Sequence, residues 1–498
     1  MNKQQIPRRG LVSCLLLISL VFAGACSKTS ANISGNTANR KVIRIAIATQ
    51  DQTINTATGG SVIREEKLLE KYLPKTGKYA NVEYNIEWSS YTSGPPITNK
   101  MLANQIDIGM MGDFPATINM TTFQKKGNGV KTLYIATLAY SPIGAGNAVL
   151  VPKDSPVKTL ADLKGKEVSV PFGSAAHGML LKALKNEGID PQKDLTLVSQ
   201  APEVGGSNLK TKQIAAHADF VPFGELFAYR GFARKIFDGA QTETPTFHGV
   251  LVRSDFAKEN PEIVTAYLKA LLTANKMFQE QPEAVATKVE KWSSVEREVV
   301  YMFLGPSGLQ QLNPVIAQVN FDALKNSVVT LKQLGKLDDS VNPEDVTKWA
   351  DDSYLRQAMQ EMGLDYDKVA KAKALVVSGK DAQTNEEIAN PKMAAQIWLE
   401  SEDKVRNFAS ITNMMAMLQK LKAERKETAG AIFVHDRDRG WKLFAENSFF
   451  VQNGKEISAF LTEQEAQAFA NKSGAKVANF QGLQQSIAQK TPVLLGAN

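Results

Sequence analysis

Two similar apolar strands, separated by about 100 residues, limit the fold of this chain more than any other feature. Residues 147–151 read NAVLV and residues 249–253 read GVLVR. Strand-like and helix-like segments alternate before and between them, which predicts parallel sheets covered by helices. We therefore expect the chain to leave a first lobe at the first strand, build a second lobe, and return at the second strand. The two crossing segments would form a hinge between the lobes.

The 498 residues are too many for one ordinary core, so several domains are expected. We predict a two-lobed α/β domain over residues 41–365, which is mainly helical after residue 261. The C-terminal part is predicted to contain a helix over 392–427, followed by a small α+β unit. The predicted boundaries are 1–25 for a signal peptide, 26–40 for a flexible tether, 41–146 with 250–340 for lobe 1, 147–249 for lobe 2, 366–390 for a linker and 391–498 for the C-terminal domain.

The N-terminus predicts export and lipid attachment. Arg8 and Arg9 precede an apolar run of about 14 residues, 11–24, which is too short to cross a membrane but suits a signal-peptide core. The run ends in AGAC, which resembles a bacterial lipobox, so Cys26 is the predicted lipidation site. The alternatives are an ordinary cleavage site that leaves a free thiol, or a twin-arginine signal. Cys14 lies inside the signal, so no disulfide is expected within the mature chain.

Charge and motifs argue against several classes of function. The formal net charge is +7, but the basic residues are scattered, so a nucleic-acid partner is not expected. The four histidines show no close pairing, which does not favour a zinc site. The chain has no P-loop, G-x-S-x-G or paired-cysteine motif, and a nucleophile pair of Ser174 and His177 lacks an evident third partner. We therefore expect no enzyme activity, no bound metal and no cofactor.

Three loops place small or capping residues where a predicted strand ends and a helix begins. They are residues 93–96 (SGPP), 109–115 (GMMGDFP) and 172–178 (FGSAAHG). The start of a helix offers unpaired N–H groups and a partial positive charge, which suit an anion. In α/β sheets such loops meet at the carboxyl ends of the strands, where ligands bind. The alternative is that Asp113 and Ser174 are only helix caps, and that glycine and proline only form turns.

Residues 41 to about 340 resemble periplasmic solute-binding proteins of the nitrate, aliphatic sulfonate and taurine type. The resemblance implies a type II periplasmic-binding-protein fold with the ligand in the cleft between the lobes. It also implies a monomer that delivers a small solute to an ABC permease from the periplasm or the outer face of the cytoplasmic membrane, here tethered by lipid. The segments that carry it are 102–115 (LANQIDIGMMGDFP), 147–155 (NAVLVPKDS), 160–170 (LADLKGKEVSV), 173–177 (GSAAH) and 247–261 (FHGVLVRSDFAKENP).

The same resemblance implies which residues contact the ligand. They are Thr49, Gln50, Asp51, Gly112, Asp113, Ser174, Ala175, His177, Phe223 and Glu225. The segment 220–225 (FVPFGE) departs from the family, in which many members have a Trp and a Pro near this point. The acids at 51, 113, 203 and 225 would repel a bare anion unless they point away or are capped. A zwitterion such as an amino-sulfonate could instead use one of them for its ammonium group.

The C-terminal part differs in character from the two lobes. Residues 430–483 weakly resemble the NosL-like copper-handling accessory lipoproteins of nitrous oxide reductase, but the Cys-Gly-Met motif of that family is absent. Met414, Met415 and Met417 could supply sulfur ligands for Cu(I), although methionines at this spacing are more often core. Two alternatives therefore stay open: a copper-handling protein that works through this part, and a pyrimidine-precursor-binding relative of the same fold.

Overall fold

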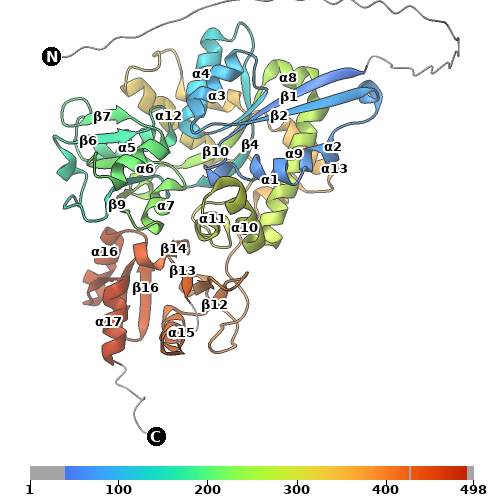
Figure 1. Cartoon of the computed structure of the whole chain (residues 1–498). Coiled ribbons are helices and arrows are strands. Elements are labelled where there is room, and N and C mark those ends of the chain that lie inside the picture. The colour runs from blue at the N-terminus through green and yellow to red at the C-terminus, as the bar shows by residue number, and fades with distance from the viewer. Residues whose placement is uncertain (1–39, 425–427, 491–498) are drawn as a thin grey trace, which may run out of the picture. The chain divides into compact units, whose positions relative to one another are not determined.

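The computed structural model describes residues 40–424 and 428–490 of the chain (Figure 1). The predicted signal peptide, Cys26 and all but the last residue of the predicted tether lie outside these residues. Among the described helices, none is long and apolar enough to cross a membrane.

The first lobe is built on a five-stranded sheet with the order β2-β1-β3-β10-β4. β1 pairs with β3 in parallel, whereas β10 is antiparallel to both β3 and β4. β3 and β10 are buried at every residue, which is expected for interior strands covered on both faces. The strands are β1 (Lys41–Thr49), β2 (Val82–Ser90), β3 (Ile108–Gly112), β4 (Thr132–Ser141) and β10 (Thr246–Arg253).

The second lobe repeats this plan with the order β7-β6-β8-β5-β9. Here β5 is antiparallel to β8 and β9, while β6 is parallel to β7 and β8. The strands are β5 (Ala148–Pro152), β6 (Glu167–Val170), β7 (Thr196–Ser199), β8 (Ala216–Asp219) and β9 (Ala233–Asp238). The lobe's helices are α5 (Ala175–Asn186), α6 (Pro202–Lys210) and α7 (Phe223–Tyr229).

The two lobes are joined by two segments, 142–147 and 239–245, that lie side by side. The N–H of Gly239 donates to the carbonyl of Asn147 at 2.7 Å. Gly144 has φ +88°, and a Cβ on it would lie 2.5 Å from the carbonyl oxygen of Thr244. A side chain at this position would force the segments apart, so glycine is required. The predicted α/β fold with two crossings is confirmed, and the crossings lie next to the two similar strands that predicted them.

Helices flank the first sheet and continue after β10. Those before the crossing are α1 (Ser61–Glu65), α2 (Leu68–Tyr72), α3 (Gly94–Leu102) and α4 (Asp113–Lys126). Those after the return are α8 (Ser254–Glu259), α9 (Pro261–Glu280), α10 (Pro282–Ser293), α11 (Arg297–Leu304), α12 (Gln318–Gln333), α13 (Ser353–Glu361) and α14 (Tyr366–Ala370). Residues 371–390 contain no further helix or strand. Asp381 nonetheless orders this segment, because its carboxylate accepts hydrogen bonds from the N–H groups of Gln383, Thr384 and Ala409.

The C-terminal part forms two small antiparallel sheets, with the orders β12-β11-β13-β14 and β16-β15-β17. The predicted helix over 392–427 is wrong in its first half, because residues 395–399 form a strand that is buried at every residue and pairs with β13. A short, mostly apolar run such as AQIWL fits a buried strand as well as a helix. The elements are β11 (Ala395–Leu399), β12 (Arg406–Phe408), α15 (Ile411–Glu424), β13 (Ala429–His435), β14 (Lys442–Phe444), β15 (Phe449–Asn453), β16 (Glu456–Phe460), α16 (Glu463–Ser473), β17 (Val477–Asn479) and α17 (Phe480–Lys490).

Candidate functional site

A narrow pocket with a free volume of about 10 Å³ lies between the two lobes. Its lining comes from the ends of strands and the starts of helices on both sides of the crossings. The first lobe contributes Gln50, Ser93, Gly94, Gly112, Pro115 and His248, and the second lobe contributes Ser174, Ala175 and Phe220. None of the nine is acidic. We call this space the oxyanion pocket below, because helix starts border it.

Three helices begin at this pocket. The N-cap residues of α3, α4 and α5 are Ser93, Gly112 and Ser174, and all three line it. A Cβ on Gly112 would lie 3.4 Å from the Cβ of Ala175 and 3.5 Å from Nε2 of His248, so the glycine keeps the pocket open. The first N–H groups of a helix have no partner within the helix, and the helix dipole is positive there. The pocket therefore favours a ligand with negatively charged oxygens.

Gln50 connects the first strand of the sheet to the start of α3. With its amide oriented so that Oε1 faces that helix, Oε1 accepts hydrogen bonds from the N–H groups of Ser93 and Gly94, both at 3.3 Å. The Nε2 group of Gln50 then remains as a donor. Gln50 is 3% exposed, so its orientation is fixed by burial as well as by these bonds.

His177 supports the second-lobe wall without lining the pocket. Its Nδ1 accepts a hydrogen bond from the N–H of Gly173 at 3.1 Å, and its ring stacks on Phe172 at a centroid distance of 4.8 Å. The N–H of His177 donates to Oγ of the N-cap Ser174 at 3.2 Å. Burial, together with the nearby charge of Lys336, lowers the pKa of His177 to about 4. The ring is therefore neutral near pH 7, and it shapes the loop rather than supplying charge.

Asp113 points away from the oxyanion pocket. Its Oδ1 accepts hydrogen bonds from Oγ1 of Thr246 at 2.6 Å and from the N–H of Phe247 at 3.3 Å, and its Oδ2 accepts one from Oγ of Ser327 at 2.9 Å. These bonds tie the start of α4 to β10 and α12. Burial raises the pKa of Asp113, although the hydrogen bonds from Thr246 and Ser327 act in the opposite direction.

Glu225 is engaged in a buried ion-pair cluster. Its Oε1 lies 2.5 Å from Nζ of Lys235, which also contacts Asp238 at 2.9 Å, and its Oε2 accepts a hydrogen bond from Asn447 at 2.9 Å. Burial alone would lower the pKa of Lys235, but the carboxylates of Asp238 and Glu225 outweigh it and raise the pKa. Glu225 therefore joins α7 to β9 and to the C-terminal part, and it lines neither pocket of the cleft.

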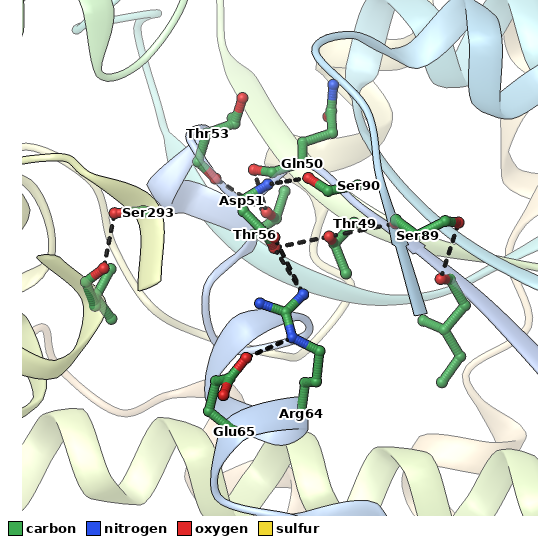
Figure 2. Close-up of polar contacts among 12 residues, drawn as sticks. Thr49, Gln50, Asp51, Thr53, Thr56, Arg64, Glu65, Ser89, Ser90 and Ser293 are labelled. Carbon is green, nitrogen blue, oxygen red and sulfur yellow. Dashed lines mark hydrogen bonds and ion pairs between the residues drawn. The ribbon is translucent and has the colours of Figure 1, made fainter. Parts of the chain in front are cut away.

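A second, larger pocket with a free volume of about 320 Å³, which we call the acidic pocket, has lining residues adjacent in sequence to those of the first. Asp51 lies here, but its carboxylate accepts a hydrogen bond from the buried Thr49 at 2.7 Å and pairs with Arg64 at 3.1 Å (Figure 2). Glu203 is exposed and has no ion-pair partner among residues 40–424 and 428–490. The lining residues are Asp51, Gln52, Thr53, Ser90, Tyr91, Thr92, Glu203, Phe223, Trp292, Ser293 and Ser294.

The structure thus separates the ten predicted contact residues. Those that line the oxyanion pocket are Gln50, Gly112, Ser174 and Ala175; those that line the acidic pocket are Asp51 and Phe223; those that line neither are Thr49, Asp113, His177 and Glu225. Their roles in binding stay predictions. Phe220, from the segment 219–225 that the resemblance also implicates, lines the oxyanion pocket, and so does His248, which the sequence analysis missed. His248 lies in a segment that reads as a plain strand, so no local signal marks it.

Two other groups of side chains bear on chemistry. Ser169, His217 and Asp219 form a hydrogen-bonded chain, at 2.7 and 2.9 Å, but all three are 0% exposed, so no substrate can reach them. Met414, Met415 and Met417 are buried in the core, as their spacing favours. Within the described ranges, no group of three or more His, Cys, Asp or Glu residues could hold a metal ion. The likeness of the C-terminal part to NosL-like proteins stays a prediction.

The chain is similar to several known proteins. Residues 99–285 match the family model described as NMT1/THI5 like. An Escherichia coli (strain K12) protein named for binding aliphatic sulfonates is 25% identical over 262 residues, which cover 52% of this chain and 76% of that protein. The taurine-binding periplasmic protein of the same organism is 26% identical over 215 residues, covering 43% of this chain and 63% of the relative.

One solved structure supports the fold. The alkanesulfonate-binding protein SsuA from Xanthomonas axonopodis pv. citri, bound to MOPS, superposes with a TM-score of 0.50 at 22% identity. The match covers 62% of this chain and 97% of that protein. The two-lobed region therefore has the fold of a periplasmic binding protein, as predicted, and the C-terminal part is additional to it.

Proposed function

Taking residues 99–285 as an NMT1/THI5-like domain within a periplasmic-binding-protein fold, we propose that this chain is the solute-binding protein of an ABC importer. It captures a small solute that carries an oxyanion, of the sulfonate class, between its two lobes. The sequence relatives named for aliphatic sulfonates and taurine support this substrate class. The protein binds and delivers the solute and performs no chemistry on it.

The observation that carries this proposal is the composition of the oxyanion pocket. The starts of α4 and α5 and the donor side chain of Gln50 converge on a space with no carboxylate in its lining, while Gln50 occupies the first N–H groups of α3. The acids that would repel an anion are held elsewhere: Asp51 by Arg64, Asp113 by Thr246 and Ser327, and Glu225 by Lys235. Backbone donors fixed in advance bind an oxyanion without a large cost in ordering.

The N-terminal sequence supports a cellular location for this activity. A signal peptide over residues 1–25 and lipid on Cys26 would hold the receptor at the outer face of the cytoplasmic membrane, near its permease. A polar tether over 26–40 would give it reach. We propose that it works there as a monomer, since one chain supplies both walls of the pocket.

Calorimetric titration of the purified protein with ethanesulfonate, taurine and nitrate tests this function, with ethylammonium as the cationic control. We expect ethanesulfonate to bind and ethylammonium not to bind. Gln50→Ala removes the Nε2 donor, and a hydrogen bond to a charged group contributes about 1.5–3 kcal/mol, so affinity should fall by about that amount. Gln357→Ala, at an exposed position on α13, is the matched control and should bind like the wild type. Equal affinity of the Gln50 variant, or binding of ethylammonium alone, would overturn the proposal.

A further inference from the structure

His248 lies on β10, an interior strand of the first-lobe sheet, and lines the oxyanion pocket. It sits on β10 opposite Gly112 of β3 and Ala139 of β4, and it is 3% exposed. Its Nε2 points to the same space as Gly112, since a Cβ on that glycine would lie 3.5 Å from Nε2. No described residue forms a hydrogen bond with Nε2, whereas Nδ1 has a partner.

A chain of two amides fixes which ring nitrogen carries the proton. Nε2 of Gln310 donates to the carbonyl of Ala145, in the first crossing segment, at 2.6 Å. Oε1 of Gln310 therefore faces Asn55 and accepts from its Nδ2 at 3.4 Å. The same Nδ2 lies 3.3 Å from Nδ1 of His248. An amide nitrogen only donates, so Nδ1 must accept, and in a neutral imidazole the proton then sits on Nε2.

The ring is neutral over the working range of pH. Burial lowers the pKa of His248 to about 4 and is the one cause of the shift. The residues around the ring carry no charge: they are Asn55, in the 3₁₀ turn Ile54–Thr56, Gln310, and Gly112 and Ala139 of the neighbouring strands. His248 therefore offers one donor, no acceptor and no charge from about pH 6 upward.

We infer that His248 is a specificity-determining residue of the oxyanion pocket, with Asn55 and Gln310 as positioning residues that hold its Nε2–H tautomer. The inference rests on the proposed function and narrows it. The buried end of the ligand is an oxyanion without a proton, such as a sulfonate or sulfate group. A phosphonate monoanion is nearly the same size, but one of its three oxygens carries a proton. Where each oxygen meets a donor, this P–OH finds no acceptor and leaves buried polar groups unpaired.

The first test compares ethanesulfonate with ethylphosphonate by calorimetric titration at about pH 5.5, where a phosphonate still carries one proton. The wild type should prefer the sulfonate by at least 10-fold, because a mismatched buried donor is costly. His248→Met removes the donor at similar size and should lose roughly 10–100-fold in sulfonate affinity. His248→Gln restores a donor near the position of Nε2 and should recover most of that loss. His435→Gln, in the C-terminal part, is the matched control.

The second test uses Asn55→Asp, which reverses the direction of the hydrogen bond. A carboxylate accepts from Nδ1–H, so the neutral ring presents a bare lone pair to the pocket, and only the imidazolium presents Nε2–H. Sulfonate affinity of this variant should fall as pH rises, since deprotonation removes the donor, while the wild type stays flat. A merely structural role of Asn55 would weaken binding equally at every pH.

The outcomes separate the two levels of the proposal. Suppose that the wild type binds ethanesulfonate. If His248→Met then binds it with unchanged affinity, or if Asn55→Asp shows a flat pH profile, the role of His248 is overturned and the proposed function stands. Absence of binding by the wild type to every oxyanion tested would overturn the proposed function itself. Thermal unfolding of each variant checks that the altered chain is folded, and the His248→Gln recovery distinguishes a lost donor from a disturbed core.

Discussion

The oxyanion pocket and the acidic pocket use neighbouring residues of the same loops but have opposite chemistry. Gln50 lines the first and Asp51 the second; Ser93 lines the first and Thr92 the second. The first is narrow, with a free volume of about 10 Å³, and contains no carboxylate, whereas the second has a free volume of about 320 Å³ and contains Asp51 and Glu203. The cleft therefore has no carboxylate at one end and two carboxylates at the other.

This difference indicates how one receptor could treat the two ends of a solute. An oxyanion fits the donor-rich end, and the remainder of the solute extends towards aromatic and acidic groups. Asp51 is neutralised by Arg64, so Glu203 is the carboxylate left to meet a positive charge. A zwitterion such as taurine and a simple alkanesulfonate would then share the first pocket and differ in the second.

The largest expected effect is on the stability of the fold. It concerns Glu225, which lines neither pocket, and its ion-pair partner Lys235. Lys235→Met leaves Glu225 and Asp238 buried without a cation, so the free energy of unfolding should fall by about 3–5 kcal/mol. Urea denaturation measures this fall. A variant as stable as the wild type would show that Glu225 is free for another role, and the comparison of the two pockets would have to include it.

Acid should destabilise the fold through the histidine of the oxyanion pocket. The pKa of His248 is about 4 in the folded chain, below its ordinary value of 6.5. Because the folded pKa is depressed, the stabilising contribution is present above about pH 6.5 and is lost as pH falls towards 4. Relative to His248→Gln, the wild type should lose at most about 3 kcal/mol across this window in urea denaturation. Parallel stability curves for the two proteins would contradict a buried neutral ring.

Filling the oxyanion pocket should weaken the binding of a sulfonate. Gly112→Ala places a methyl group within 3.4 Å of Ala175 and 3.5 Å of His248, in space that the ligand would occupy. We expect about 2 kcal/mol of lost binding free energy for ethanesulfonate, with little change in the unfolding temperature. Titration calorimetry and thermal unfolding measure the two effects. Unaltered affinity would place the ligand outside the oxyanion pocket.

The smallest expected effect separates ligands by their distal end. Glu203→Gln should lower the binding free energy of taurine by about 0.5–1 kcal/mol, since an exposed ion pair contributes little. The binding of ethanesulfonate should not change. Competition titration of the two sulfonates against wild type and variant resolves a difference of this size. Equal weakening of both ligands would mean that the acidic pocket does not distinguish charge.

The fold could be predicted from patterns that are local in sequence, whereas the site depends on the direction in which individual side chains point. The similar strands at 147–151 and 249–253 predicted both crossings. The strand-to-helix loops contain Gly112, Ser174 and Ala175, which line the pocket, whereas Gln50 was predicted from the family resemblance. Asp113 sits in such a loop too, but whether a first-turn carboxylate faces the ligand or the neighbouring strand depends on tertiary packing. His248 depends on Asn55, which is 193 residues away in the sequence, so no local pattern reveals its tautomer.

The central claim is that a proton-free oxyanion is held between the lobes with its tail towards the acidic pocket. A crystal structure of the protein with 2-bromoethanesulfonate, with bromine located by anomalous diffraction, tests this directly. We predict sulfonate oxygens within hydrogen-bond distance of Nε2 of His248 and the first N–H groups of α4 and α5, with the bromine on the side of Asp51 and Glu203. A bromine peak beside Gly112, or a sulfonate bound outside the cleft, would contradict the account.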